Sequence, residues 1–218
     1  MYLKKHPPIP TAVVFDAYGT LLSNTKTTKP FAQLREIIGG MGIDVSDYTQ
    51  RAMTSRHTLS SLALSYGADV PLETMARLDG ELINELLGVE PYPDVERTLR
   101  YVMRRGAHVV IASNLAWPYS LPVHTLIDVV KQGGMINRTQ ISTAYSFDVG
   151  HIKPVPEFYS NVAADLESLS VEPQRIFMVG DRQIEDVDGP TRAGWRAWKV
   201  DRQSGQGLLD GPWDQWLG

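Results

Sequence analysis

Cysteine is absent from all 218 residues of the chain. This absence excludes disulfides, thiolate metal ligands and a cysteine nucleophile, and it fits a reducing compartment. Long apolar runs are also lacking, because Pro7, Pro8 and Pro10 interrupt the N-terminal segment and Asp16 ends the next hydrophobic stretch. We therefore expect neither a signal peptide nor a transmembrane span, and we predict a cytoplasmic location.

An excess of basic residues is missing too, since the formal net charge is -4. Nucleic acids and anionic membranes favour a basic surface, so we expect neither as a partner. A small anionic substrate stays compatible with this charge, because a few cations or a bound metal can reverse the potential inside a cleft. The five histidines are scattered without metal-ligand spacing, so any metal site is expected to use carboxylates.

The chain has the composition of an ordinary globular protein, with 43% hydrophobic and 21% charged residues. Short apolar runs rich in Val, Ile, Phe or Trp show little alternation, which is typical of strands covered by helices on both faces. Helical patterns open at Pro93 and Pro156, between these runs. The alternation predicts an α/β fold, a Rossmann-like doubly wound parallel sheet. Its predicted strands are Ala12–Phe15, His108–Ala112, Arg175–Val179 and Arg196–Val200.

Residues 25–90 break this alternation, because they contain helical patterns and no strand-like run. Polar and proline-rich stretches flank the segment, as expected for the two linkers of an inserted domain. We predict a helical cap over residues 25–90 and a Rossmann-like core formed by residues 1–24 and 91–218. The expected cap helices are Phe31–Ile38, Tyr48–Tyr66 and Leu72–Leu87. In the loop-rich tail, Trp213 and Trp216 are expected to pack onto the core.

Polar residues follow the predicted strands at their C-terminal ends, the edge where open parallel sheets bind ligands. Asp16 comes directly after the first strand, and Gly19 and Thr20 follow it with a tight turn and a hydroxyl. Ser113 and Asn114 follow the second strand. A buried acidic residue needs a partner or a cation, which makes Asp16 a candidate catalytic group.

Two further groups come later in the chain. Lys153 precedes Pro154 and a predicted helix, and several carboxylates crowd the turn from Gly180 to Asp188. Like charges held so close together need a cation to coexist. Each of these signals is weak alone, since a turn, a surface lysine or a solvated acidic loop has the same composition.

Together and in this order, the four segments resemble the haloacid dehalogenase-like (HAD) superfamily of hydrolases. The resemblance rests on Asp-x-x-Gly-Thr-Leu at Asp16, Ser113-Asn114, Lys153-Pro154 and Gly-Asp-x-x-x-x-Asp at Gly180. It covers nearly the whole chain, and the helical insert resembles the cap of the subgroup whose cap lies between the first two motifs.

The resemblance implies that Asp16 is a covalent nucleophile. It implies Mg²⁺ bound by Asp16, the backbone carbonyl of Tyr18 and Asp181, with Asp186 as a direct or water-mediated ligand. Lys153 would stabilise charge in catalysis. The substrate-binding groups implied are Ser113, Asn114 through its N–H, and Thr20.

Tyr18 departs from the phosphatase pattern, because phosphatases of this superfamily usually carry a second aspartate there as general acid. Asp-Ala-Tyr-Gly-Thr-Leu is instead similar to the first motif of the metal-free 2-haloacid dehalogenases, which also have a tyrosine near Tyr159. A dehalogenase would need an arginine near the cap, and Arg35, Arg51 and Arg56 are available. Asp181 favours the metal-dependent phosphatase, because this carboxylate has no evident use without a cation.

We therefore predict a Mg²⁺-dependent hydrolase, a phosphatase acting on a small phosphorylated metabolite through an aspartyl-phosphate on Asp16. The alternatives are a 2-haloacid dehalogenase-type hydrolase through an aspartyl ester, or a HAD-fold protein with weak or lost turnover because of Tyr18. The expected partner is an anionic small molecule, and the expected state is a monomer or a homodimer.

Overall fold

The computed structural model describes residues 11–132 and 140–217 of the chain. Residues 1–10 and 218, which the sequence assigns to the core, lie outside the described residues. Five parallel strands form the main sheet in the order β5-β4-β1-β6-β7. They are β1 (Ala12–Phe15), β4 (His108–Ser113), β5 (Ile141–Tyr145), β6 (Ile176–Gly180) and β7 (Arg196–Lys199). This arrangement confirms the predicted Rossmann-like α/β class.

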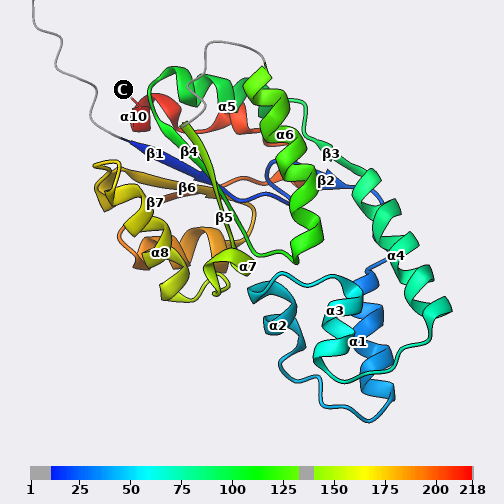
Figure 1. The fold of residues 1–218 in the computed structure, drawn as a ribbon. Helices are drawn as coiled ribbons and strands as arrows, with labels where there is room; N and C mark the ends of the chain where they lie inside the picture. Colours follow the sequence, from blue (N-terminus) through cyan, green and yellow to red (C-terminus); the bar gives the residue numbers. More distant parts are fainter. Residues whose placement is uncertain (1–10, 133–139, 218) are drawn as a thin grey trace, which may run out of the picture.

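Helices cover both faces of the sheet, as Figure 1 shows. On one face, alternate residues such as Val13 and Phe15 pack against α5 (Val95–Arg104), α6 (Ser120–Gln132) and α10 (Trp213–Leu217). On the other face, Ala12 and Val14 pack against α8 (Pro156–Glu167). The residues of β1, β4 and β6 are almost all buried on both sides, which explains why these three strands read as continuous apolar runs.

The strand prediction was incomplete at one edge. Four of the five strands were predicted to within a residue or two at either end, but β5 was not. Its residue Ser142 is exposed and Thr143 is half-buried, because β5 pairs only with β4. An edge strand with polar positions lacks the apolar run that marked the buried strands.

Four helices lie between two very short strands, β2 (Leu22–Asn24) and β3 (Val89–Pro91). They are α1 (Pro30–Gly40), α2 (Tyr48–Thr54), α3 (Leu59–Ser65) and α4 (Leu72–Leu87). Their apolar faces form a cluster of their own, beside one end of the main sheet (Figure 1). We call these four helices the helical insert. The single helix predicted over Tyr48–Tyr66 was wrong, because the chain leaves α2 at Ser55 and begins α3 at the Thr58 capping box.

The two connections to the helical insert run side by side. Strands β2 and β3 pair antiparallel, with Leu22 opposite Pro91 and Asn24 opposite Val89. Thr25 continues the pairing, since its backbone N–H and its hydroxyl both donate to the Gly88 carbonyl. The chain therefore leaves and re-enters the core at neighbouring points.

The C-terminal tail packs onto the sheet, as predicted. Trp213 and Trp216 are buried, and the Trp216 ring stacks on Phe177 of β6 with centroids 4.6 Å apart. The tail is more regular than expected, because both tryptophans belong to the short helix α10. Other short segments are 3₁₀ or π-helical turns: η1 (Trp117–Tyr119), η3 (Pro173–Arg175), η4 (Gln183–Asp188), η5 (Arg202–Ser204) and η6 (Leu208–Asp210). Two four-residue helices, α7 (Ser146–Val149) and α9 (Gly189–Arg192), complete the fold.

Candidate active site

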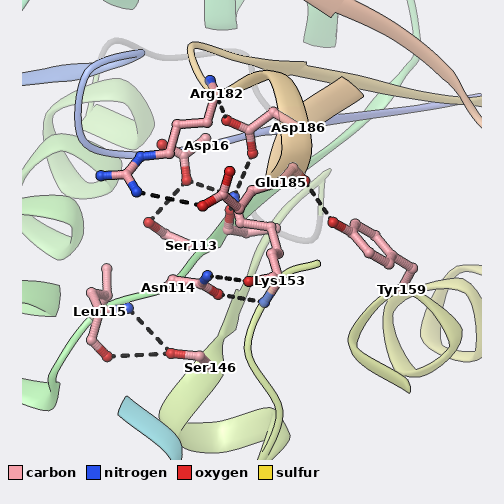
Figure 2. A network of polar contacts seen from close by, with 11 residues as sticks. Asp16, Ser113, Asn114, Leu115, Ser146, Lys153, Tyr159, Arg182, Glu185 and Asp186 are labelled. Carbon is pink, nitrogen blue, oxygen red and sulfur yellow. Dashed lines mark hydrogen bonds and ion pairs between the residues drawn. The ribbon is translucent and has the colours of Figure 1, made fainter. Parts of the chain in front are cut away.

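The carboxyl ends of β1, β4 and β6 meet where the sequence places its polar residues. Asp16 follows β1, Ser113 ends β4, and Asp181 follows β6. Lys153 comes from the loop between α7 and α8, and its side chain points into the same site (Figure 2). The fold thus brings together four of the predicted groups, whose chemical roles are still predictions at this point.

Lys153 is the centre of this network. Its Nζ lies 2.7 Å from Asp16 Oδ1 and 2.7 Å from Asp186 Oδ1, and it donates to the Ala112 carbonyl at 3.0 Å. Burial disfavours the ammonium charge, but the carboxylates of Asp16 and Asp186 outweigh burial and raise the pKa of Lys153. The lysine is therefore charged, and all three of its donors are used.

Asn114 holds the backbone of this lysine. Its Nδ2 donates to the Lys153 carbonyl at 2.7 Å, and its Oδ1 accepts from the Lys153 backbone N–H at 2.7 Å (Figure 2). The sequence suggested the backbone N–H of Asn114 as a substrate ligand but gave no hint of this use of the side chain, because the partner lies 39 residues away. The two bonds fix where the ammonium of Lys153 can reach.

Three carboxylates converge beside Lys153. Asp16, Asp181 and Asp186 each offer an oxygen, and these three oxygens lie within 4.8 Å of one another. Burial raises the pKa of Asp181, with a further contribution from Asp16, and burial raises the pKa of Asp186 to about 6. Three ionised carboxylates and one ammonium leave an excess of two negative charges, which a divalent cation would balance.

The donor set fits a hard metal ion. Asp181 Oδ1 is buried and accepts no hydrogen bond within the described ranges, so one carboxylate oxygen of the cluster residues lacks a donor. Carboxylate oxygens are the ligands that Mg²⁺ prefers in proteins. These residues can therefore hold a divalent cation.

Two glycines allow the carboxylates to approach the backbone. A Cβ on Gly19 would lie 2.5 Å from Asp181 Oδ2, and Gly19 has a φ of +85°, which disfavours other residues. A Cβ on Gly180 would lie 2.2 Å from the Asp186 side chain. Both positions are explained by the close packing of acidic side chains.

The hydrogen bonds to the Asp16 carboxylate are asymmetric. The carboxylate is buried, and its Oδ1 accepts from Ser113 Oγ at 3.1 Å as well as from Lys153. Both bonds end on Oδ1. The other oxygen, Oδ2, has no protein hydrogen bond in the described part of the chain, which leaves it for reaction or metal binding.

The Tyr18 hydroxyl is hydrogen-bonded within the protein, and the Thr20 side chain is buried. The Tyr18 hydroxyl donates to the Tyr119 carbonyl at 2.9 Å, and burial raises the pKa of this phenol, with smaller contributions from Tyr145 and Glu85. The Thr20 side chain is fully buried, and its Oγ1 has no hydrogen-bond partner among the described residues. Its substrate contact stays a prediction.

A cavity of about 420 Å³ lies between the helical insert and the core. Tyr18 and Asn114 line it on the core side. Arg35 lines it on the side of the insert and forms no ion pair among the described residues. Arg51 and Arg56 pair instead with Asp47 and Asp148. Glu85, which the sequence gave no reason to single out, also lines the cavity.

Tyr159 lies near the site without entering it. Its hydroxyl donates to the Glu185 carbonyl at 2.6 Å (Figure 2), and its ring lies so close to Gly189 that a Cβ there would meet the hydroxyl at 2.1 Å. This contact holds the acidic turn against α8.

A Rossmann-like sheet with a buried aspartate, a buried lysine and an acidic cluster at its carboxyl edge is typical of a class of α/β hydrolases. The family model described as haloacid dehalogenase-like hydrolase matches residues 10–194. The chain therefore belongs to the haloacid dehalogenase-like hydrolases, and it is an enzyme of this family.

Two phosphatases and a 2-haloacid dehalogenase are similar to the chain. It is 30% identical over 216 residues to phosphatase MT3486 of Mycobacterium tuberculosis (strain CDC 1551 / Oshkosh), covering 90% of this chain and 89% of that one. Its fold is similar to a HAD phosphatase from Thermococcus onnurineus, with 23% identity, a TM-score of 0.54, and 91% and 89% of the two chains covered. L-2-haloacid dehalogenase from Xanthobacter autotrophicus gives 19% identity, a TM-score of 0.51, and coverage of 88% and 78%. At these identities the two structures support the fold alone.

No helix within residues 11–132 and 140–217 is long and apolar enough to cross a bilayer. The cytoplasmic location and the monomeric or homodimeric state stay predictions.

Proposed function

We propose that this chain is a Mg²⁺-dependent phosphatase acting on a small phosphorylated metabolite. The observation that carries the proposal is the convergence of Asp181 with Asp16 and Asp186, with an orphaned carboxylate oxygen. Lys153 alone leaves this cluster negatively charged, so the cluster needs a cation before it can accept an anionic phosphoryl group. The 30% identical relative, which is named a phosphatase, supports the same chemistry.

In this proposal Asp16 Oδ2 attacks phosphorus, forming an aspartyl-phosphate while the bond to the leaving oxygen breaks. Water then hydrolyses the acyl phosphate, releasing inorganic phosphate and restoring the carboxylate. Ser113 and Lys153, which donate to Asp16 Oδ1 in this structure, would each turn a hydrogen bond from that oxygen to the phosphoryl oxygens. The Asn114 side chain keeps Lys153 in place. Mg²⁺ would be held by Asp16, the Tyr18 carbonyl, Asp181 and Asp186, and it would neutralise the charge of the reacting anion.

The helical insert acts as the cap in this proposal. Residues 25–90 carry one wall of the cavity, which includes Phe31, Tyr48 and Met53, and the core carries the other. A leaving group bound there would lie between the insert and the nucleophile. Cap residues would therefore select the substrate.

A 2-haloacid dehalogenase is the second candidate. Two observations favour it: the Tyr18 hydroxyl is engaged with a backbone carbonyl, and Arg35 lines the cavity with no ion pair to any residue in 11–132 or 140–217. Halide leaves without a proton, and a guanidinium suits a substrate carboxylate. Asp181 counts against this candidate, as does the excess negative charge. A protein that keeps the metal site with weak turnover is the third reading.

The test is release of p-nitrophenol from p-nitrophenyl phosphate, with Mg²⁺ and with a chelator. Because this leaving group departs without a general acid, Tyr18 does not prevent turnover at a site that is otherwise able to transfer a phosphoryl group. We expect metal-dependent turnover in the wild type and its loss in Asp16→Asn. Chloride release from 2-chloropropionate, without any phosphatase turnover, would replace the proposal by the second candidate, and no turnover of either substrate would favour the third.

A further inference from the structure

A buried carboxylate joins the helical insert to the core. Glu85 lies in the last turn of α4 and is only 3% exposed. This is an unfavourable place for an anion, because burial removes water and the C-terminal end of a helix carries partial negative charge. Such a carboxylate needs strong partners, and it has two.

The partners come from two different parts of the fold. Lys29, which precedes α1, donates its backbone N–H to Glu85 Oε1 at 2.6 Å. Tyr119, at the end of η1 in the core, donates its hydroxyl to Glu85 Oε2 at 2.5 Å. One carboxylate therefore links the entry of the helical insert, its exit and the core.

Tyr119 also reaches the loop that carries the nucleophile. Its carbonyl accepts the Tyr18 hydroxyl, and its ring packs edge-on against the Tyr18 ring with centroids 6.1 Å apart. The Tyr119 ring also packs against the ring of Phe31 in α1, with the two ring centroids 6.0 Å apart. Tyr119, Tyr18 and Phe31 line the cavity together with Glu85.

Another polar bridge between insert and core is weaker. Arg56 pairs with Asp148 of α7, but the two side chains are 64% and 37% exposed. Exposed pairs contribute little, whereas a buried hydrogen bond to a charged group is costly to break because the charge stays behind. The bond from Tyr119 to Glu85 is thus the polar contact on which closure depends most.

We propose that Tyr119 and Glu85 form a clasp that holds the helical insert closed over the cavity and orders the Tyr18 loop beneath it. They are positioning residues, since neither is placed against the reacting atoms. Its kinetic consequence rests on the proposed phosphatase activity, but its structural consequence does not.

The test compares Tyr119→Phe with Tyr66→Phe. Both substitutions remove a tyrosine hydroxyl that donates to a carboxylate at 2.5 Å, but Tyr66 bonds to Asp47 within the insert. Hydrogen exchange is measured at the Lys29 amide and in peptides covering residues 85–90. We expect exchange there to rise about tenfold in Tyr119→Phe and to stay unchanged in Tyr66→Phe, with β4 protected in both as a sign of intact folding.

Kinetics provide a second readout. With p-nitrophenyl phosphate, we expect KM to rise about tenfold in Tyr119→Phe while kcat changes less than about twofold, because the closed state is less populated before substrate binds. Adding Glu85→Gln to Tyr119→Phe should partly reverse both the faster exchange and the higher KM. Once the Tyr119 hydroxyl is gone, burying a neutral amide costs less free energy than burying an unpaired carboxylate.

The outcomes separate the two proposals. Exchange at Lys29 that is unchanged in Tyr119→Phe, or raised equally in Tyr66→Phe, overturns the clasp. Raised exchange in Tyr119→Phe, together with no phosphatase turnover in the wild type, supports the clasp and overturns the proposed function instead.

Discussion

Asp186 and Asp181 show how single residues set the conditions for metal binding. Asp181 directly follows β6 and is half-buried, and Asp186 lies in η4 and is buried. Burial raises the pKa of each carboxyl. Below its raised pKa of about 6, Asp186 carries a proton that a metal ion must displace. Above this pKa the carboxylate is ionised and available. The affinity for a divalent cation should therefore increase as the pH rises through this range.

This predicts a pH-dependent thermal shift. We expect the rise in Tm on adding Mg²⁺ to be larger at pH 7.5 than at pH 5, because at a fixed ligand concentration tighter binding stabilises the folded state more. Calorimetry with Mg²⁺ and with a chelator measures the shift. Asp181→Asn should abolish most of it at both pH values, and an equal shift in that variant would contradict the metal site.

Tyr18 leads to a prediction about leaving groups. Its hydroxyl proton is directed at the Tyr119 carbonyl, so the site has no acid in the usual phosphatase position. Tyr18→Asp should raise turnover of an alkyl phosphate, such as glycerol phosphate, relative to p-nitrophenyl phosphate by about tenfold or more. Phosphate release from both substrates gives the ratio. Tyr18→Phe removes the hydroxyl without adding a carboxyl, and a similar gain there would show that the aspartate does not act as an acid.

At the level of elements, the sequence predicts the strands that carry an apolar run and misses the strand that lacks one. Strands β1, β4 and β6 are buried between helices, and the edge strand β7 keeps Ala197 and Trp198 half-buried, whereas β5 has the exposed Ser142 at the opposite edge. Strands β2 and β3 are three residues each and pair across the whole insert. No local pattern encodes such a distant pairing.

The same limit applies to the site. The carboxylates were predictable because strand ends of a parallel sheet share one edge, so position in the sequence implied position in space. The use of the Asn114 side chain was not, and neither was Glu85, which reads as an ordinary glutamate on an amphipathic helix. Its partner Tyr119 lies 34 residues away, and only the packing of the insert on the core brings them together.

For the whole molecule, the separate hydrophobic cluster of the helical insert predicts that the core folds without it. Replacing residues 25–88 by Asn-Gly would join Asn24 to Val89, which are paired neighbours in the β2–β3 ladder. We expect cooperative unfolding of this shortened chain in urea, with circular dichroism typical of an α/β fold. We also expect KM for p-nitrophenyl phosphate to rise about tenfold or more, since one wall of the cavity is gone.

The control for this experiment is the full-length chain carrying Leu62→Ala, which loosens the insert's own core. It should affect the insert and leave the unfolding of the sheet unchanged. A shortened chain that is unfolded in buffer would show that the insert and the core fold as one unit, and it would contradict the boundary at residues 25–90.

The pairing of β2 with β3 also bears on how such a chain can diverge. Because Asn24 and Val89 are paired neighbours, the two ends of the helical insert lie as close together on the core as the two ends of a hairpin loop. Lengthening such a connection costs little loop entropy once its ends are held together. The helices between them can thus gain, lose or exchange segments over generations while Asp16, Lys153 and the acidic cluster keep their places.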